Sequence, residues 1–191
     1  MSLSFTTIEE LANWLRDEKV DCSSWGTGGS KTIADLWEEL VSRECCLFPG
    51  PKRSVVVAVI IIEDGPRVLC EAGQEMSDGR FRERRSPPAE KKRGDESIRD
   101  TVLRCLGEEL ELAPNKFEII RMQEEPPSKP EKSGAYPKLP TEYIKHYAQV
   151  STRCLPTTDF DTNEIGKPPR RDRRHWWTWC NRHELDLPPL W

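Results

Sequence analysis

The sequence has no segment that suits a membrane span or a targeting signal. No apolar run approaches the roughly 20 residues that a helix needs to cross a bilayer, and the longest, from Val55 to Ile62, suits a buried strand. The N-terminus lacks a basic region followed by an apolar one, and it is too acidic for a transit peptide unless one has been removed. We therefore expect no membrane among its partners and a cytoplasmic location, unless the chain is the processed form of an organellar protein.

The cysteine patterns of disulfide-rich and zinc proteins are also missing. The chain has seven cysteines, an odd number, and no two of them form a Cys-x-x-Cys pair. An odd number would leave a stray thiol in a secreted protein, but it needs no explanation where thiols stay reduced. This pattern indicates an intracellular protein and gives no support for a zinc site.

The sequence has little excess charge of either sign. Lys and Arg number 29 and Asp and Glu number 33, so the formal net charge is −4. Any affinity for nucleic acid would therefore have to be local. Apolar residues make up 36% of the 191 positions, which is enough for one modest core with some embellishment around it.

The first fifty residues are predicted to form two helices. Thr6 or Thr7 can cap the first helix, because a glutamate follows three residues later as in a capping box. Apolar residues recur at helical spacing in both, at Ile8, Leu11, Trp14 and Leu15 and then at Ile33, Leu36, Trp37, Leu40 and Val41. A pair this small cannot bury its own apolar faces. We assign residues 1–50 to a helical extension that docks on the rest of the chain or, with the tail at 185–191, on a protein partner.

Residues 51–191 are assigned to a second domain with an α/β pattern. A β-branched run at 55–62, a turn at 63–66 and a returning run at 67–72 predict a β-hairpin. A helix is expected at about 96–110, ended by Pro114, and further strands at 117–123, 143–151 and 175–180. The polar or proline-rich stretches at 74–93, 124–140 and 156–172 are expected to be loops.

The expected helix carries the most informative pattern in the chain, from Glu96 to Leu112. This stretch resembles the box of the Nudix hydrolase family, G-x5-E-x7-R-E-U-x-E-E-x-G-U, where U is aliphatic. The residues that match the box are Glu96, Arg104, Leu106, Glu108, Glu109 and Leu112. Three residues depart from it: Glu90 stands at the first glycine, Cys105 at the glutamate after the arginine, and Glu111 at the second glycine.

The resemblance implies a fold and a chemistry. The fold would be an α/β/α sandwich with a mixed central sheet, over about residues 54–182. Nudix enzymes use Mg²⁺ or Mn²⁺ to split a phosphoanhydride in a nucleoside diphosphate linked to a further group. The resemblance assigns catalysis to Arg104, Glu108 and Glu109 and metal binding to Glu96, Glu108 and Glu109. Other acids could complete the metal set: Glu90, Asp100, Asp159, Asp161 or Glu164.

The cysteine in the box weakens the catalytic half of this resemblance. Cys105 stands where the family has a carboxylate, and a thiol is a soft ligand that suits Mg²⁺ poorly. We therefore expect a degenerate site with weak or lost hydrolysis, in a protein that binds a nucleotide, RNA or a protein partner. The alternative is an active Mg²⁺- or Mn²⁺-dependent pyrophosphohydrolase.

Basic residues near the box could bind phosphate groups. The candidates are Arg82, Arg84, Arg85, Lys92 and Arg93, and a second cluster lies at 170–174. They could grip a substrate phosphate, follow an RNA backbone, or simply lie in solvated loops. Strand alternation would place Trp177 and Trp179 in the core and leave Trp176 to stack on a base.

Overall fold

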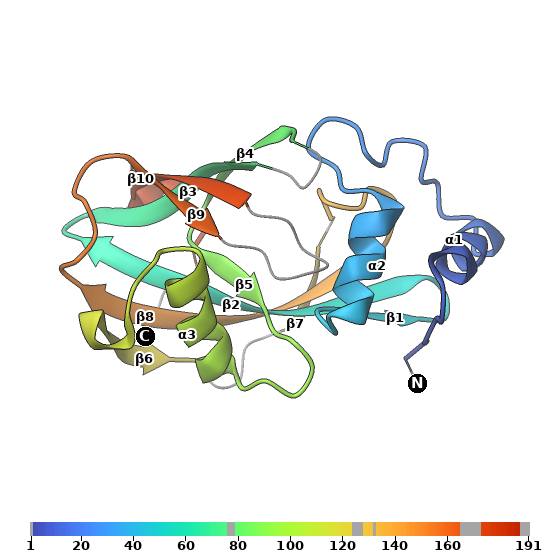
Figure 1. Ribbon diagram of the computed structural model, residues 1–191, viewed down its shortest axis with the longest axis horizontal. Coiled ribbons are helices and arrows are strands. Elements are labelled where there is room, and N and C mark those ends of the chain that lie inside the picture. The colour runs from blue at the N-terminus through green and yellow to red at the C-terminus, as the bar shows by residue number, and fades with distance from the viewer. Residues whose placement is uncertain (1, 76–78, 124–127, 132, 165–172, 188–191) are drawn as a thin grey trace. The chain divides into compact units, whose positions relative to one another are not determined.

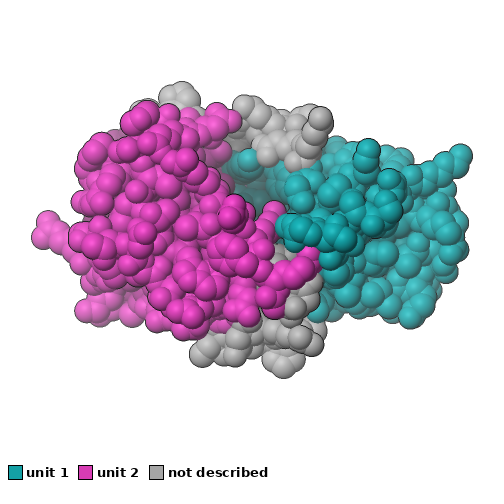
Figure 2. Space-filling view, turned by 90° about the horizontal axis from the view of Figure 1, so that it is seen from above, with its two compact units in different colours: residues 1–57, 91–96, 127–145 teal, residues 58–90, 97–126, 146–191 magenta. Residues whose placement is uncertain are grey.

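The chain folds into two compact units in a computed structural model that describes residues 2–75, 79–123, 128–131, 133–164 and 173–187. Unit 1 consists of residues 1–57, 91–96 and 127–145, and unit 2 of residues 58–90, 97–126 and 146–191 (Figure 2). Unit 1 therefore contains the whole of segment 1–50 together with pieces from later in the chain. The arginines at 170 and 171 and the tail from 188 onward lie outside the described residues.

The two expected helices of unit 1 are confirmed, as α1 (Ile8–Asp17) and α2 (Ile33–Val41) (Figure 1). Thr7 caps α1, because its hydroxyl accepts a hydrogen bond from the Glu10 N–H at 3.2 Å. Glu10 in turn accepts from the Thr6 N–H at 2.7 Å. The expected apolar face of α1 is buried at Leu11 and Leu15.

The buried face of α2 differs from the apolar stripe in its sequence. Leu36 is buried as expected, but Asp35 and Glu39 are buried too, whereas Val41 is 55% exposed. Asp35 belongs to the capping box at the start of the helix. Glu39 can be buried because Lys31, Arg53 and Lys91 contact its carboxylate. The spacing of apolar residues along the helix does not predict these contacts.

The strands of unit 1 form two short pairs. β1 (Cys46–Phe48) pairs antiparallel with the start of β2 (Lys52–Asp64). β7 (Ser128–Glu131) pairs antiparallel with the start of β8 (Thr141–Thr152). β2 and β8 continue into unit 2, so both units share these two strands along the sequence.

Unit 2 is built on the predicted hairpin of β2 and β3 (Arg67–Glu75), which pair antiparallel with Asp64 opposite Arg67. The strand order is β6-β8-β2-β3-β10-β9. The ends of this order are β6 (Phe117–Met122) and β9 (Phe160–Glu164), and β10 (Arg173–Asn181) lies between β3 and β9. β4 (Phe81–Ser86) pairs with β3, and β5 (Ala89–Lys91) pairs with β2.

The expectation that the three polar stretches are loops was wrong where they form strands. β4 and β5 lie within 74–93, β7 lies within 124–140 and β9 lies within 156–172. β4 and β9 alternate in exposure but carry arginine, glutamate, threonine and asparagine in place of an apolar face. These strands form because their backbones pair with neighbouring strands. Backbone pairing does not require a hydrophobic pattern, so the sequence does not predict it.

α3 (Ile98–Glu108) is the predicted box helix and packs on the strands of unit 2 (Figure 1). Ser97 caps it by accepting from the Asp100 N–H at 3.1 Å. The helix ends at Glu108, two residues before the predicted end, and Pro114 starts a short 3-10 helix, Pro114–Lys116. The core of the unit contains Val102, Cys105 and Leu106 of α3 with Ala58, Ile60, Ile62, Leu69, Ala148, Val150 and Trp177.

The expected α/β class is confirmed, with three α-helices and an open sheet among the described residues. A second 3-10 helix, Arg182–Glu184, follows β10. Within the ranges that the structure describes, no helix has the length and apolar character to cross a membrane.

Candidate functional site

The end of the box helix takes the backbone path that the Nudix box provides with a glycine. Glu109 caps the C-terminus of α3, and Glu111 adopts a left-handed conformation with φ of 55°. The chain then turns back, because the Leu112 N–H donates to the Leu106 carbonyl at 2.9 Å. A non-glycine residue in this conformation is strained. Glu111 gains a compensating bond, accepting from the Asn163 N–H at 3.1 Å.

Glu109 is the centre of a buried group of carboxylates. Glu71 from β3, Glu90 from β5 and Glu164 from β9 are all buried, as is Glu109. Burial, followed by the negative charge of Glu90 and Glu71, raises the pKa of Glu109 well above its usual range. The Glu109 carboxyl also shares a hydrogen bond with Glu90.

Two arginines neutralise part of this cluster. Arg104 of α3 places Nη1 3.2 Å from Oε1 of Glu90 and 3.8 Å from Oε2 of Glu108. Arg84 of β4 places Nε 2.9 Å from Oε2 of Glu71. Arg104 thus joins a box glutamate to Glu90, the residue that replaces the first box glycine.

A buried histidine joins the two remaining carboxylates. His175 Nδ1 lies 2.7 Å from Oε1 of Glu71, and Nε2 lies 3.3 Å from Oε2 of Glu164. Burial alone would lower the pKa of His175, but the hydrogen bonds to Glu164 and Glu71 outweigh it and raise the pKa to about 9. The ring is therefore an imidazolium at neutral pH and donates to both carboxylates.

Cys105 contributes no charge to this group. It is fully buried in the core, and burial, followed by the charges of Glu109 and Glu90, raises the pKa of its thiol well above the usual value. A protonated thiol is not a metal ligand. The structure thus gives Cys105 a packing role at a position where the Nudix box carries a glutamate.

The carboxylates of the cluster contact the protein's own cations. Glu71 lies beside Arg84 and His175, Glu164 lies beside His175, and Glu90 lies beside Arg104, which also approaches Glu108. As these side chains stand, no group of three or more His, Cys, Asp or Glu in the described part of the chain could hold a metal ion. The donor set therefore does not fit the Mg²⁺ or Mn²⁺ that the box implies.

The residues expected to bind metal and phosphate are distributed over both units. Glu96 belongs to unit 1, where it accepts from the Arg93 N–H at 3.0 Å, whereas Glu108 and Glu109 belong to unit 2. Arg93 also pairs with Glu44 at 3.2 Å, and Lys92 donates to the Gly94 carbonyl. These two basic residues therefore make local contacts in unit 1.

The three arginines on β4 lie on the two faces of the strand. Arg82 and Arg84 are partly buried on one face, and Arg85 is exposed on the other, where it pairs with Glu184. Arg84 belongs to the carboxylate cluster through Glu71. The expected phosphate-binding set is therefore not one patch: Arg84 is engaged in the cluster, and Arg85 faces away from it.

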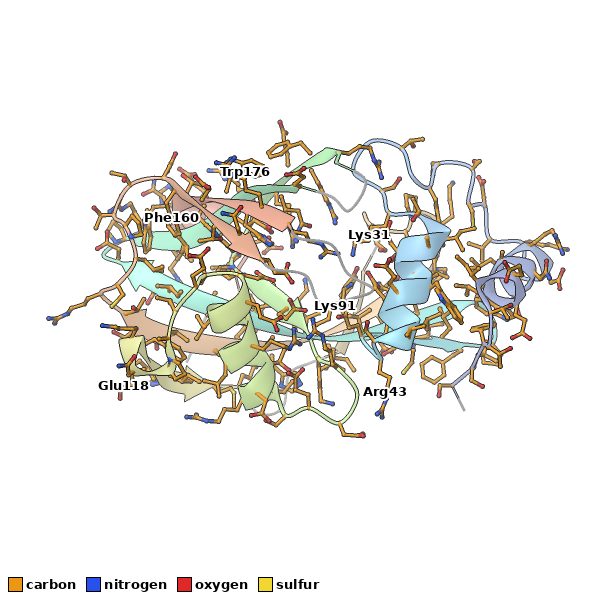
Figure 3. All side chains as sticks on the ribbon, viewed as in Figure 1. Lys31, Arg43, Lys91, Glu118, Phe160 and Trp176 are labelled. Carbon is orange, nitrogen blue, oxygen red and sulfur yellow. The ribbon has the colours of Figure 1, made fainter. Side chains whose placement is uncertain are left out.

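A second feature of unit 2 is an exposed aromatic group on β4 and β10. Phe81 is 53% exposed and meets Trp176 edge to face, with ring centroids 5.1 Å apart (Figure 3 labels Trp176). The Phe81 ring lies directly over Gly73, where an added β-carbon would overlap it. Arg174 stacks over Trp176 at 5.3 Å and pairs with Asp161 at 3.0 Å. We call Phe81, Trp176 and Arg174 the aromatic platform.

The other two tryptophans of β10 only partly follow the expected alternation. Trp177 is buried and donates to the Thr162 hydroxyl at 2.7 Å, as expected of a core residue. Trp179 is only partly buried, donates to the Pro156 carbonyl and has Arg67 over its ring at 5.6 Å. The register of β10 against β3 shifts between Trp176 and Trp177. Such an irregularity interrupts the strict alternation of side chains between the two faces of a strand.

Sequence reasoning missed two members of the carboxylate cluster, Glu71 and His175. Glu71 lies between apolar residues of β3, and a charged residue at such a position is a sign of a buried partner. His175 directly precedes a segment with three tryptophans, and the sequence reasoning considered only the tryptophans. Glu90 and Glu164 had been expected only as possible fillers of a metal site.

Unit 1 has a separate pocket of about 530 Å³. Apolar lining comes from Phe5, Trp37 and Phe48, and Arg43 and Lys92 supply positive charge. Arg43 pairs with Asp95 at 3.0 Å. The expected docking of a protein partner on the N-terminal helices stays a prediction.

No protein-family profile matches this sequence, and no curated protein gives a significant match. The resemblance to the Nudix box therefore rests on the residues of the box and their spacing.

Proposed function

We propose that unit 2 is a Nudix-type sandwich that has lost metal-dependent hydrolysis and binds single-stranded RNA through the aromatic platform. Support for the fold comes from the matching box residues and from Glu111, which takes the left-handed conformation of the box glycine. All seven cysteines are free thiols, which suits a protein that works in a reducing, intracellular compartment.

The loss of hydrolysis is inferred from the ion pairs around Glu109. A metal site needs carboxylates that are available to the ion, but here Glu71, Glu90 and Glu164 contact Arg84, Arg104 and His175. Burial, followed by the charges of Glu90 and Glu71, also raises the pKa of Glu109, which disfavours its ionised form. Binding a divalent cation would require separating several of these buried pairs, which costs free energy.

The single observation that carries the RNA proposal is the exposed Phe81 ring on Gly73 beside Trp176. Proteins that bind single strands stack bases on exposed aromatic rings, and each stack contributes about 1–3 kcal/mol. A guanidinium such as that of Arg174 adds a cation–π surface and a phosphate donor. Double-stranded RNA does not offer its base faces, so the platform favours a single strand.

Fluorescence anisotropy with a short labelled single-stranded RNA tests the proposal. We expect Phe81→Ala to weaken binding by about tenfold, as the loss of one stacking contact predicts. Ile120→Ala is the matched control, because Ile120 is also an exposed apolar residue of unit 2, at 46%. Equal affinity of wild type and Phe81→Ala, or an equal loss in both variants, would remove the platform from the interface.

One observation favours the alternative, an active hydrolase. Glu90 lies beside Glu109 and could supply the carboxylate that Cys105 replaces. The test is to incubate the protein with a panel of nucleoside diphosphate compounds and Mg²⁺ or Mn²⁺. Turnover that disappears in Glu109→Gln would establish the hydrolase and overturn the proposed loss of activity.

A further inference from the structure

The apolar stripe of α2 is only partly covered by the rest of unit 1. Leu36 is buried, but Trp37 and Leu40 are half-buried and Val41 is 55% exposed. The last three residues all line the pocket of about 530 Å³. Apolar surface left against water is unfavourable, so a ligand that covers it would gain free energy.

The segment at 2–5 forms another part of the pocket wall and is held to its surroundings. The Leu3 N–H donates to the Leu47 carbonyl of β1 at 2.7 Å. The Phe5 ring packs against Trp14 of α1, with ring centroids 5.6 Å apart. This part of the wall is therefore fixed by contacts within unit 1.

One face of the β1–β2 pair supplies a further part of the wall. Cys46 of β1 lies opposite Ser54 of β2. Side chains alternate along a strand, so Phe48 shares the face of Cys46. Val56 likewise shares the face of Ser54, and all four residues line the pocket.

Two cations of the pocket meet at Gly94. The Lys92 ammonium donates to the Gly94 carbonyl. Arg43, which follows the end of α2 and is labelled in Figure 3, lies over the same glycine. An added β-carbon on Gly94 would be 2.9 Å from Cζ of Arg43, so only a glycine leaves room for the guanidinium there. The Gly94 N–H also donates to the Arg43 carbonyl at 2.9 Å.

Both cations keep the capacity to bind an anion. Arg43 pairs with Asp95 at 3.0 Å, but the two side chains are 66% and 92% exposed. An ion pair this exposed contributes little, so a carboxylate on a ligand can replace Asp95. Lys92 uses one of its three ammonium donors on a backbone carbonyl, which carries no charge.

Glu44 also lines the pocket, but its carboxylate is engaged with cations. It lies 3.2 Å from Nε of Arg93 and 3.7 Å from Nζ of Lys91. Its side chain is only 2% exposed. Arg43 and Lys92 therefore determine which sign of charge on a ligand is favoured.

We propose that this pocket binds a small molecule that has an apolar body and one carboxylate group. The rings of Phe5, Trp37 and Phe48 contact the apolar body. The volume of about 530 Å³ lies within the range of small-molecule sites, about 300–1,000 Å³. All the lining residues belong to unit 1, so the proposal does not rest on the RNA platform of unit 2.

The carboxylate of the ligand binds at Gly94, next to Arg43 and Lys92. Two oxygens in one plane match the fork of a guanidinium, and Asp95 shows that Arg43 accepts this partner. Lys92 adds a second positive charge at the same place. A neutral ligand of the same shape lacks both contacts.

Thiol labelling of the full chain tests the pocket, because Cys46 lies in its wall and is exposed. Cys154 is an exposed thiol in unit 2 and serves as the internal control. The probes are 1-naphthylacetate and octanoate, and mass spectrometry of peptides gives the rate at which iodoacetamide labels each cysteine. At tenfold its Kd a ligand occupies about nine-tenths of the sites, so labelling of Cys46 should slow about tenfold.

We expect 1-naphthylacetate to slow the labelling of Cys46 and to leave that of Cys154 unchanged. Stronger protection by octanoate would support the site and identify an acyl chain as the apolar body. Acetate, which has no apolar body, and naphthaleneethanol, which has no charge, should both protect poorly. Equal protection by the alcohol, equal slowing at Cys154, or no protection by either carboxylate would overturn the proposal.

Opposite charges at position 41 give an independent test, because Val41 lines the pocket and is exposed enough to change without disturbing the core. Val41→Glu places a like charge near the ligand carboxylate, and Val41→Lys is its matched control. We expect Val41→Lys to bind 1-naphthylacetate about fivefold more tightly than Val41→Glu in calorimetric titration. Equal affinity in the two variants would overturn the site.

Discussion

His175 Nδ1 lies 2.7 Å from Oε1 of Glu71 inside unit 2, and this contact makes stability depend on pH. The contacts with Glu164 and Glu71 raise the pKa of His175 from 6.5 to about 9. Because the folded protein holds the proton more tightly than the unfolded chain, this stabilisation is complete below pH 6.5 and is lost as pH rises through about 9. The loss should be on the order of 3 kcal/mol.

Urea unfolding at a series of pH values measures this effect. We expect the unfolding free energy of wild type to fall across the window from 6.5 to about 9. His175→Gln should be less stable at neutral pH and nearly flat across that window. His183→Gln, which changes an exposed histidine, should keep the wild-type slope. A wild-type slope in His175→Gln would mean that another group titrates.

Cys105→Glu should turn the carboxylate cluster into a site that responds to metal. The change buries a further carboxylate beside Glu109 and Glu90, so we expect it to destabilise the metal-free protein by about 2–4 kcal/mol. Mg²⁺ should then raise the unfolding midpoint of the variant but not that of wild type. Cys105→Gln is the control, because glutamine has nearly the size of glutamate but carries no charge. A rise in the midpoint of Cys105→Gln with Mg²⁺ would contradict this prediction.

The elements that the sequence predicts are those whose pattern is local. The hairpin of β2 and β3 follows from a β-branched run, a turn and a returning run. α3 follows from a stretch with apolar residues on one side of the helix and carboxylates on the other. β4 and β9 could not be predicted in this way, because their residues are polar and their pairing depends on strands far away in the sequence.

The candidate site shows the same division. Glu109 and Arg104 were found because the box fixes their spacing within one helix. Glu71 and His175 were missed because β3 and β10 lie 104 positions apart at this contact. Glu39 was missed for a related reason, since its cationic neighbours come from separate segments of unit 1.

Glu39→Gln should be strongly destabilising although it changes one atom of the side chain. Three cations, Lys31, Arg53 and Lys91, contact the Glu39 carboxylate. Although burial alone would raise the pKa of Glu39, these cations hold it well below its usual range. Removing one partner of a buried ion pair leaves the other charges uncompensated and costs roughly 3–5 kcal/mol.

The control for Glu39→Gln is Glu142→Gln in the same unit. Glu142 pairs with Lys52 at 2.7 Å in a partly exposed position, so its loss should cost less than about 1 kcal/mol. Chemical denaturation of both variants at neutral pH gives the comparison. Similar losses in the two variants would show that the buried cluster is held by contacts other than Glu39.

Glu111 allows a test of the backbone conformation that follows the box helix. Its φ of 55° is one that glycine adopts without strain and that residues with a β-carbon adopt at a cost of about 1–2 kcal/mol. Glu111→Gly and Glu111→Ala both lose the bond from the Asn163 N–H, so the comparison between them isolates the backbone. We expect the glycine variant to be more stable than the alanine variant by about 1 kcal/mol in urea unfolding. Equal stability of the two variants would mean that the chain leaves the left-handed conformation once the glutamate is gone, and that the carboxylate, by its bond to Asn163, is what maintains the turn.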